Sequence, residues 1–258
     1  MTPEGRVEVM GIVNATPDSF SGDGREGAAA IDHGFRLAAE GADLLDVGGE
    51  STRPGHVPIS TEVELARAIP VVRALAAEGI EVSIDTSRLE VAEAALKAGA
   101  RMINDQWALR RSPGIAGLAA RAGVRLVLMH NQEGHLYSED LLASIKGSLR
   151  ASIALAVAAG VDPSRIIVDP GIGFAKTAEQ NVEVLRRLGE LRELGFPILV
   201  AASRKGFLER LYGQPLEMRA WGTAAVVTAS ILRGAALVRV HDVKEMVAVT
   251  RVAEGMRG

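Results

Sequence analysis

Residues 7–20 read VEVMGIVNATPDSF, an apolar, β-branched run that stops at Asn14 and continues as a polar loop. Runs of this kind are typical of strands buried in a parallel sheet. Seven more follow along the chain: DLLDV (43–47), EVSI (81–84), RMIN (101–104), RLVLM (125–129), RIIVD (165–169), PILVA (197–201) and ALVRV (236–240). A stretch compatible with a helix follows each run, such as TEVELARAIPVVRALAAE at residues 61–78. The chain is therefore predicted to contain eight βα units.

Glycines stand near the expected ends of the helices, where a left-handed C-cap favours this residue. They are Gly41, Gly79, Gly99, Gly123, Gly160, Gly195 and Gly234. Thr61 with Glu64 fits a capping box at the start of one helix. No linker or shift in composition divides the chain, so we expect one α/β domain over residues 1–258. Eight units in one domain predict a (β/α)8 TIM barrel with its active site at the carboxyl ends of the strands. A doubly wound sheet is the alternative, but no G-x-G-x-x-G follows the first strand.

The composition excludes several classes of protein. The 258 residues are 48% hydrophobic and carry a formal net charge of −3, which argues against disorder and against binding through a general basic field. The chain has no cysteine, which excludes disulfides and a cysteine nucleophile and fits a reducing compartment. No apolar run approaches 18 residues, and the first residues lack the apolar core of a signal peptide. We therefore expect a cytoplasmic protein without nucleic-acid or membrane partners.

Polar residues stand at the carboxyl end of every predicted strand, where a buried strand has no use for them. In chain order they are Asn14, Asp46, Asp85, Asn104-Asp105, His130-Asn131, Asp169, Ser203-Arg204-Lys205 and Arg239 with His241-Asp242. Any one of them could be a loop starter or a helix cap. All eight strands share the pattern, however, and in a closed barrel these ends meet at the rim where barrel enzymes place their chemistry. The pattern therefore predicts an active site.

Four of these residues suit a flat heterocycle with an amidine-like edge. Asp85, Asn104 and Asp169 supply carboxylate and amide groups from neighbouring parts of the rim, and Lys205 adds a cation. Buried carboxylates are costly without partners, so a donor-rich ligand or a basic side chain must compensate them.

A second group carries positive charge or donors. Arg53, Arg239 and His241 suit a phosphate or diphosphate. A solvated loop charge at Arg53 and a structural ion pair at Arg239 are the alternatives. Asn14 is a weak metal ligand alone, but it could complete a Mg²⁺ shell together with a diphosphate, because that ion keeps waters and substrate oxygens.

Taken together, the motifs resemble dihydropteroate synthase, a family of pterin-binding (β/α)8 enzymes of folate biosynthesis. The resemblance rests on MGIVNATPDSFS (10–21), LLDVGGESTRPG (44–55), VSIDT (82–86), MINDQ (102–106), LMH (128–130), IIVDPGIGFAKT (166–177), ASRKGFL (202–208), WGTAAVVTASILRGA (221–235) and RVHDV (239–243). GGESTRPG and DPGIGF in this order are highly specific. One departure is Ala175, where the family usually has glycine.

The resemblance implies an activity. The family joins 6-hydroxymethyl-7,8-dihydropterin diphosphate to p-aminobenzoate and releases diphosphate, with Mg²⁺, in an SN1-like substitution. A homodimer is usual in the family, and small molecules are its substrates. By matching motif, the catalytic residues would be Asp85, Lys205, Arg239 and His241.

The resemblance also implies the binding residues. Those expected to hold the pterin are Asp85, Asn104, Met129, Asp169 and Lys205. Those expected to hold the diphosphate are Asn14, Arg53, Arg239 and His241, with Asn14 also on the metal. Those expected to shape the p-aminobenzoate pocket are Thr52, Pro54, Phe174, Ser203 and the stem of Lys205. Two loops are expected to be mobile, with Asp18, Ser19 and Phe20 in the first and Ser51, Thr52 and Arg53 in the second.

Three other functions share part of this pattern. A pterin-binding methyltetrahydrofolate:corrinoid methyltransferase would keep the Asp/Asn/Asp pocket but has no use for a diphosphate clamp. A non-catalytic pterin-binding paralogue would be favoured by loss of Arg53, Lys205 or His241, and all three are present. A generic phosphate-binding barrel would carry a glycine-rich phosphate loop after its last strands, and SRKGF is not clearly one.

Overall fold

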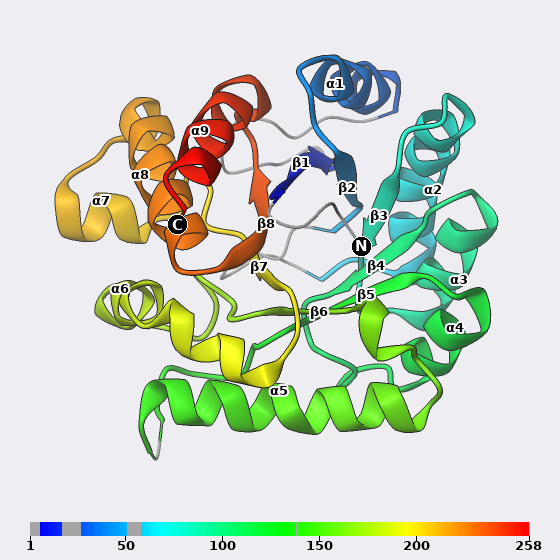
Figure 1. Ribbon diagram of the computed structural model, residues 1–258. Coiled ribbons are helices and arrows are strands. Elements are labelled where there is room, and N and C mark those ends of the chain that lie inside the picture. The colour runs from blue at the N-terminus through cyan, green and yellow to red at the C-terminus, as the bar shows by residue number, and fades with distance from the viewer. Residues whose placement is uncertain (1–5, 17–26, 51–57, 138, 258) are drawn as a thin grey trace.

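Eight parallel strands close into a barrel in the order in which they occur along the chain, with β8 pairing back onto β1. The computed structural model describes residues 6–16, 27–50, 58–137 and 139–257 (Figure 1). The strands are β1 (Glu8–Asn14), β2 (Leu44–Gly48), β3 (Val82–Asp85), β4 (Met102–Asp105), β5 (Arg125–Met129), β6 (Ile166–Asp169), β7 (Ile198–Val200) and β8 (Ala235–Val240). The predicted (β/α)8 barrel is confirmed, and a doubly wound sheet is excluded.

Helices surround the barrel on the outside (Figure 1). They are α1 (Ala28–Ala39), α2 (Thr61–Ala77), α3 (Leu89–Lys97), α4 (Gly114–Ala122), α5 (Leu141–Ala158), α6 (Ala178–Arg186), α7 (Phe207–Tyr212), α8 (Arg219–Leu232) and α9 (Val243–Gly255), with short 3₁₀ helices η1 (Pro163–Arg165), η2 (Leu188–Leu194) and η3 (Leu216–Met218). All seven glycines predicted at helix ends have a positive φ, as a left-handed C-cap requires. The predicted capping box is wrong by one residue, because Ser60 caps α2 by accepting from the backbone of Val63 at 3.4 Å.

Alternation along the strands separates the core into an inner and an outer part. The inner cluster fills the barrel and contains Met10, Leu44, Met102, Val127, Ile167, Leu199 and Leu237. Their neighbours in sequence, such as Leu45 and Ile103, belong instead to the outer cluster, together with helix residues such as Val72. Side chains two positions further along a strand face the same way. One step toward the carboxyl end, the barrel interior therefore receives Asp46, Asn104, Met129, Asp169 and Arg239.

The helix α5 covers one side of the barrel and has a mixed character. By length and composition alone it is apolar enough to cross a membrane, with a mean hydropathy of 1.5 over its 18 residues. It nevertheless carries Lys146 and Arg150, and its buried side chains Leu142, Ile145 and Leu149 pack in the cluster that includes strand residues of β6 and β7. In this fold the apolar side of α5 is used to cover the barrel.

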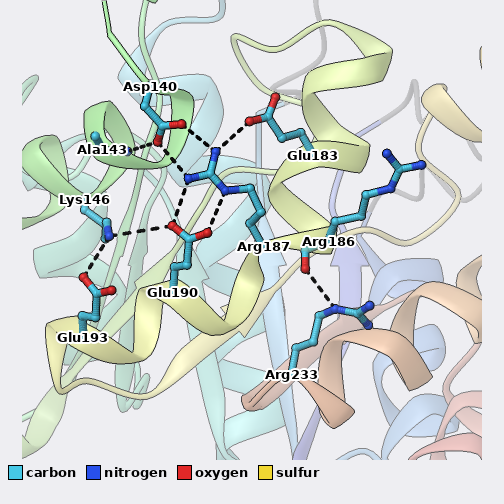
Figure 2. Close-up of polar contacts among 9 residues, drawn as sticks. All are labelled: Asp140, Ala143, Lys146, Glu183, Arg186, Arg187, Glu190, Glu193 and Arg233. Carbon is cyan, nitrogen blue, oxygen red and sulfur yellow. Dashed lines mark hydrogen bonds and ion pairs between the residues drawn. The ribbon is translucent and has the colours of Figure 1, made fainter.

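A network of ion pairs joins the start of α5 to α6 and η2 (Figure 2). Arg187 donates to Asp140 at 2.6 Å, to Glu183 at 2.8 Å and to Glu190 at 2.7 Å. Asp140 also caps α5 by accepting from the backbone of Ala143 at 3.0 Å. The hydrogen bond from Arg187 lowers the pKa of Asp140 to about 2. Single exposed ion pairs contribute little, but this arginine ties three elements together at one point.

Candidate active site

Arg239 is the central charge of the barrel interior. Its Nε donates to Asp46 Oδ2 at 2.6 Å, and one terminal nitrogen donates to Asp85 Oδ2 at 2.9 Å. The side chain is 13% exposed, so both ion pairs are formed away from bulk water. Burial lowers the pKa of Arg239 and the charges of Asp46 and Asp85 raise it, with a net rise, so the guanidinium stays charged. The guanidinium group of Arg239 therefore joins two carboxylates from two other strands.

Asp46 accepts a hydrogen bond from this arginine inside the barrel, and it was given no role by the sequence analysis. It is fully buried on β2, and the same Oδ2 that accepts from Arg239 also accepts from Asn104 Nδ2 at 2.9 Å. Its other oxygen, Oδ1, has no hydrogen-bond partner within the described structure. Asp46 thus fixes both Asn104 and Arg239, two of the predicted site residues.

Asp85 lies at the end of β3 in a row that crosses four strands. The register pairs Asn14 with Gly48, Gly48 with Asp85, and Asp85 with Asn104. Gln106 Nε2 donates to both oxygens of Asp85, at 2.7 and 2.6 Å. Burial raises the pKa of Asp85 to about 7, although the charge of Arg239 and the Gln106 hydrogen bond act in the opposite direction. Burial therefore makes the carboxyl group of Asp85 harder to ionise than a free aspartate.

Asp169 and Lys205 face the same interior from β6 and from the loop after β7. Asp169 is 2% exposed and accepts from the backbone N–H of Gly171 at 2.7 Å. Burial raises its pKa to about 6, against the opposing effects of that hydrogen bond and of Lys205. Burial and the charge of Arg239 lower the pKa of Lys205 to about 8, while Asp169 and Asp85 oppose that shift. Lys205 Nζ lies 4.2 Å from the centre of the Phe174 ring.

His241 sits on the rim directly after β8. Its backbone N–H donates to Ser203 Oγ at 3.1 Å, and its Nδ1 lies 3.0 Å from the same oxygen. Burial, with the charges of Arg204 and Arg239, lowers the pKa of His241 well below its usual value. This shift favours the neutral imidazole, so of the two roles expected for His241, positive charge or hydrogen-bond donor, it favours the donor. Ser203 is buried and directs its hydroxyl at His241. Its predicted place in the p-aminobenzoate pocket stays a prediction.

The remaining predicted residues divide by whether the structure describes them. Asn14 ends β1 and is half-buried. Met129 ends β5, is 3% exposed and pairs in register with Asp169. Seven residues lie outside the described ranges: Asp18, Ser19, Phe20, Ser51, Thr52, Arg53 and Pro54.

The donor set limits how Mg²⁺ could be held. Within the described ranges no three His, Cys, Asp or Glu side chains gather as a metal site. Asn14 offers one amide oxygen at the rim, in the same row as Asp85. Because Mg²⁺ keeps several waters and takes oxygens from phosphate groups, one protein ligand suits an ion that arrives with a diphosphate. These residues fit Mg²⁺ in that limited sense, and they do not form a resident metal centre.

The two predicted groups of site residues are not separate in the fold. Arg239, expected to hold the diphosphate with His241, lies one step deeper along β8 and pairs with the carboxylates expected to hold the pterin. The reason is the strand period: Arg239 follows Leu237 by two residues and so points into the barrel. The result is a buried acidic cluster, made of the carboxylates of Asp46, Asp85 and Asp169 with the cations Arg239 and Lys205, and His241 lies at its edge. The cluster can accept hydrogen bonds from a flat donor-rich ring and stabilise positive charge beside it.

Comparison with known proteins gives the family of the chain. A family model described as pterin binding enzyme matches residues 10–241, and the chain belongs to the pterin-binding enzymes. Dihydropteroate synthase of Bacillus subtilis (strain 168) is 44% identical over 251 residues, covering 96% of this chain and 88% of that protein. Dihydropteroate synthase of Mycobacterium leprae is 46% identical over 262 residues, covering 95% and 92%. Among the pterin-binding enzymes, the chain therefore belongs to the dihydropteroate synthase family.

Solved structures give the same result. Dihydropteroate synthase of Clostridium difficile, determined in the presence of pteroic acid, matches with a TM-score of 0.93 and 43% identity over 98% of both chains. The enzyme of Xanthomonas albilineans with 4-aminobenzoic acid matches with a TM-score of 0.91 and 44% identity, covering 98% of this chain and 94% of that chain. The family resemblance inferred from the motifs is confirmed.

Proposed function

We propose that this chain joins 6-hydroxymethyl-7,8-dihydropterin diphosphate to p-aminobenzoate, giving 7,8-dihydropteroate and diphosphate. The observation that carries the proposal is the acidic cluster in the barrel mouth. Arg239 pairs there with Asp46 and Asp85, Asn104 donates to Asp46, and Asp169 is buried. An amidine-like edge of the pterin can supply further donors to this cluster, in which Asp46 Oδ1 has no hydrogen-bond partner within the described structure. A methyltransferase activity is not needed to explain the acidic cluster, and the relatives compared above are synthases.

The reaction follows from charge. The bond between the pterin methylene carbon and the diphosphate oxygen breaks, and its electron pair leaves with the diphosphate. The cation that forms is delocalised into the ring, where the carboxylates of Asp85 and Asp169 stabilise it. The neutral aniline nitrogen then attacks the methylene and loses its proton to solvent, so no tuned general base is required. Catalysis consists mostly of positioning and electrostatics.

The leaving group needs partners at the rim. His241, as a neutral imidazole, can donate one hydrogen bond to a diphosphate oxygen from the ring nitrogen that does not face Ser203. When bound with the diphosphate, Mg²⁺ would be held by Asn14 and would neutralise charge on the departing group. Lys205 Nζ lies over the Phe174 ring, and we expect its ammonium group to contact the pterin while its stem and Phe174 contact p-aminobenzoate.

A direct assay tests the proposed function. Purified protein is incubated with the pterin diphosphate, Mg²⁺ and labelled p-aminobenzoate, and labelled dihydropteroate is the expected product. Omitting Mg²⁺ with a chelator present should suppress its formation. Absence of labelled product from folded protein, or methyl transfer from methyltetrahydrofolate to a corrinoid, would contradict the proposal.

The titrating groups predict a bell-shaped pH dependence. As pH rises, Asp169 and Asp85 ionise with pKa values of about 6 and about 7, and their carboxylates gain the negative charge that stabilises the cation. Above about pH 8, Lys205 loses its proton and the rate falls. We expect kcat/KM for the pterin diphosphate to peak between these limits. Lys205→Arg should remove the alkaline limb and Asp85→Asn should weaken the acid limb, whereas a profile that neither variant changes would contradict the assignment.

We also propose that the enzyme acts in the cytoplasm as a homodimer, with its contact on α8. Trp221 is 71% exposed there, and Ala225, Ala229 and Leu232 follow it at helical spacing. Ala225 and Ala229 also line a hollow of about 350 Å³ between α6, α7 and α8. One face therefore carries both an aromatic side chain and an apolar hollow. In a two-fold dimer the same face of both copies meets, so the Trp221 side chains and the apolar hollows of the two copies can be buried together.

Replacing Trp221 with Glu should dissociate this dimer. A charge at the exposed aromatic cannot be buried without a partner, so the pairing becomes unfavourable. Light scattering after size exclusion should give the parent at twice 27.1 kDa and the variant at 27.1 kDa. The control is Leu155→Glu, because Leu155 is 52% exposed on α5 and does not line the hollow. A monomeric parent, or a variant that stays dimeric, contradicts the proposed contact.

A further inference from the structure

We propose that Lys176 is a positioning residue for the substrate site, holding the loop of residues 170–175 that orients Asp169, Phe174 and Lys205. The inference rests on the proposed function, since these three residues are placed there in the pterin and p-aminobenzoate pockets. Lys176 itself follows the loop, is 5% exposed and takes no part in the mechanism above.

The ammonium group of Lys176 is fully used by its surroundings. Its Nζ lies 3.1 Å from His130 Nδ1 and donates to the backbone oxygens of Gly171 and Phe174, each at 3.1 Å. An ammonium has three N–H donors, and three acceptors meet it here. Burial lowers the pKa of His130 to about 3, so its ring is neutral and can accept at Nδ1. Lys176 thus joins the end of β5 to both ends of the loop.

Other side chains hold the same loop at single points. The backbone N–H of Gly171 donates to Asp169 at 2.7 Å, and that of Gly173 donates to Asn181 at 2.6 Å. Tyr137 donates its hydroxyl to the backbone oxygen of Ala175 at 2.9 Å. Ala175 has a φ of +49°, a conformation that a residue with a Cβ adopts only where its surroundings impose it. Lys176 is the member of this set that bonds the loop twice.

The loop packs directly on the substrate residues. A Cβ added to Gly173, which has a φ of +83°, would lie 2.8 Å from Lys205 Cδ, so the stem of Lys205 rests on the loop backbone. The ring of Phe174 lies beneath Lys205 Nζ at 4.2 Å. Asp169 is fixed from the other side by its bond to Gly171. A shift of the loop backbone therefore moves Asp169, Phe174 and Lys205 together.

Charge adds to this geometry. Burial lowers the pKa of Lys176 to about 7, while Asp169 raises it and Lys205 lowers it further. A side chain without an amino group at this position would leave two buried backbone oxygens without their donor, and the loop would have to move to reach another. Displacements of about 1 Å at substrate-positioning groups cost on the order of 10²-fold in rate.

The test replaces Lys176 with Met, which keeps the length of the stem and removes the donors. At a temperature where circular dichroism shows the variant folded, we expect the Kd of unphosphorylated 6-hydroxymethylpterin and the KM of p-aminobenzoate each to rise about tenfold. Lys176→Arg, which keeps donors and charge, should recover part of both. The matched control is Lys146→Met, because Lys146 bonds Glu193 on the outside of the barrel. It should leave both constants unchanged.

The outcomes separate the inference from the proposed function. A parent protein that neither binds the pterin nor forms dihydropteroate contradicts the function itself. A folded Lys176→Met variant with a lower Tm but with both constants within twofold of an active parent overturns the positioning role. If Lys176→Met does not fold, Tyr137→Phe removes one hydroxyl bond to the same loop. It should raise the KM of p-aminobenzoate about threefold, and no change in either constant would overturn the proposal.

Discussion

We expect Asp85→Asn to lower kcat by roughly 10²–10³-fold, equivalent to about 3–4 kcal/mol of transition-state stabilisation, in a protein that still folds. The carboxylate lies in the acidic cluster, where its charge faces the cation that forms as diphosphate leaves. The amide keeps the shape of the side chain and can still accept from Arg239. Gln106 can turn its own amide to match the new group. The fold therefore keeps its hydrogen bonds while the site loses one negative charge.

Steady-state kinetics under saturating substrates measure this effect. The control is Asp162→Asn, the same chemical change at an exposed cap before β6, at the opposite end of the barrel. It should leave kcat unchanged. A kcat for Asp85→Asn within threefold of the parent would refute the assigned role.

The barrel could be predicted from the sequence because its signals are local. Each strand is a short apolar run, and seven helical segments are followed by a glycine whose positive φ the structure confirms. The polar residue at each strand end is equally local. Asp85, Asn104 and Asp169 could therefore be selected before any contact was known, since alternation places them in the barrel mouth.

The partners inside the mouth could not be predicted in this way. Asp46 and Arg239 are 193 residues apart, and their contact depends on the closure of the barrel and on the register of several strands. Asp46 was noted at the end of a strand. The available signal for its role was that a buried carboxylate needs hydrogen-bond donors, and its neighbours in sequence offer none. Gln106 lies within a quoted motif, but only the fold shows that its amide reaches Asp85. The loops with Asp18 and Arg53 lie outside the described residues, so their predicted roles stay predictions.

The largest effect on both stability and binding is expected for Arg239→Met. Removing the fork leaves Asp46 and Asp85 as buried charges without their shared partner, and breaking a buried ion pair in this way costs about 3–5 kcal/mol. Both the bare pterin and Mg²⁺–diphosphate should bind more weakly, because the arginine sits among the pterin acceptors. The motif-based expectation, a clamp for the diphosphate alone, predicts that only diphosphate binding changes. Calorimetric titration of each ligand into parent and variant distinguishes the two.

A matched control exists at the other end of the barrel. Arg125 also bridges two carboxylates, Glu8 at 2.7 Å and Glu81 at 2.5 Å, but with its side chain 22% exposed. Arg125→Met should cost less stability, since water can solvate the glutamates, and should leave ligand binding unchanged.

The destabilisation of Arg239→Met should also depend on pH, with a definite sign. Arg239 lowers the pKa of Asp85, so its loss raises that pKa beyond the present value of about 7. A carboxyl group whose pKa is raised by folding carries no penalty below its unfolded pKa of 3.8, and the penalty grows as pH rises toward the folded value. The difference in unfolding free energy between parent and variant should therefore change little from pH 4 to about pH 7, where Asp85 is mostly protonated in both folded proteins, and should grow above pH 7. Urea unfolding at pH 7 and at pH 9 measures it, and a difference that does not grow between them would mean that Arg239 does not neutralise Asp85.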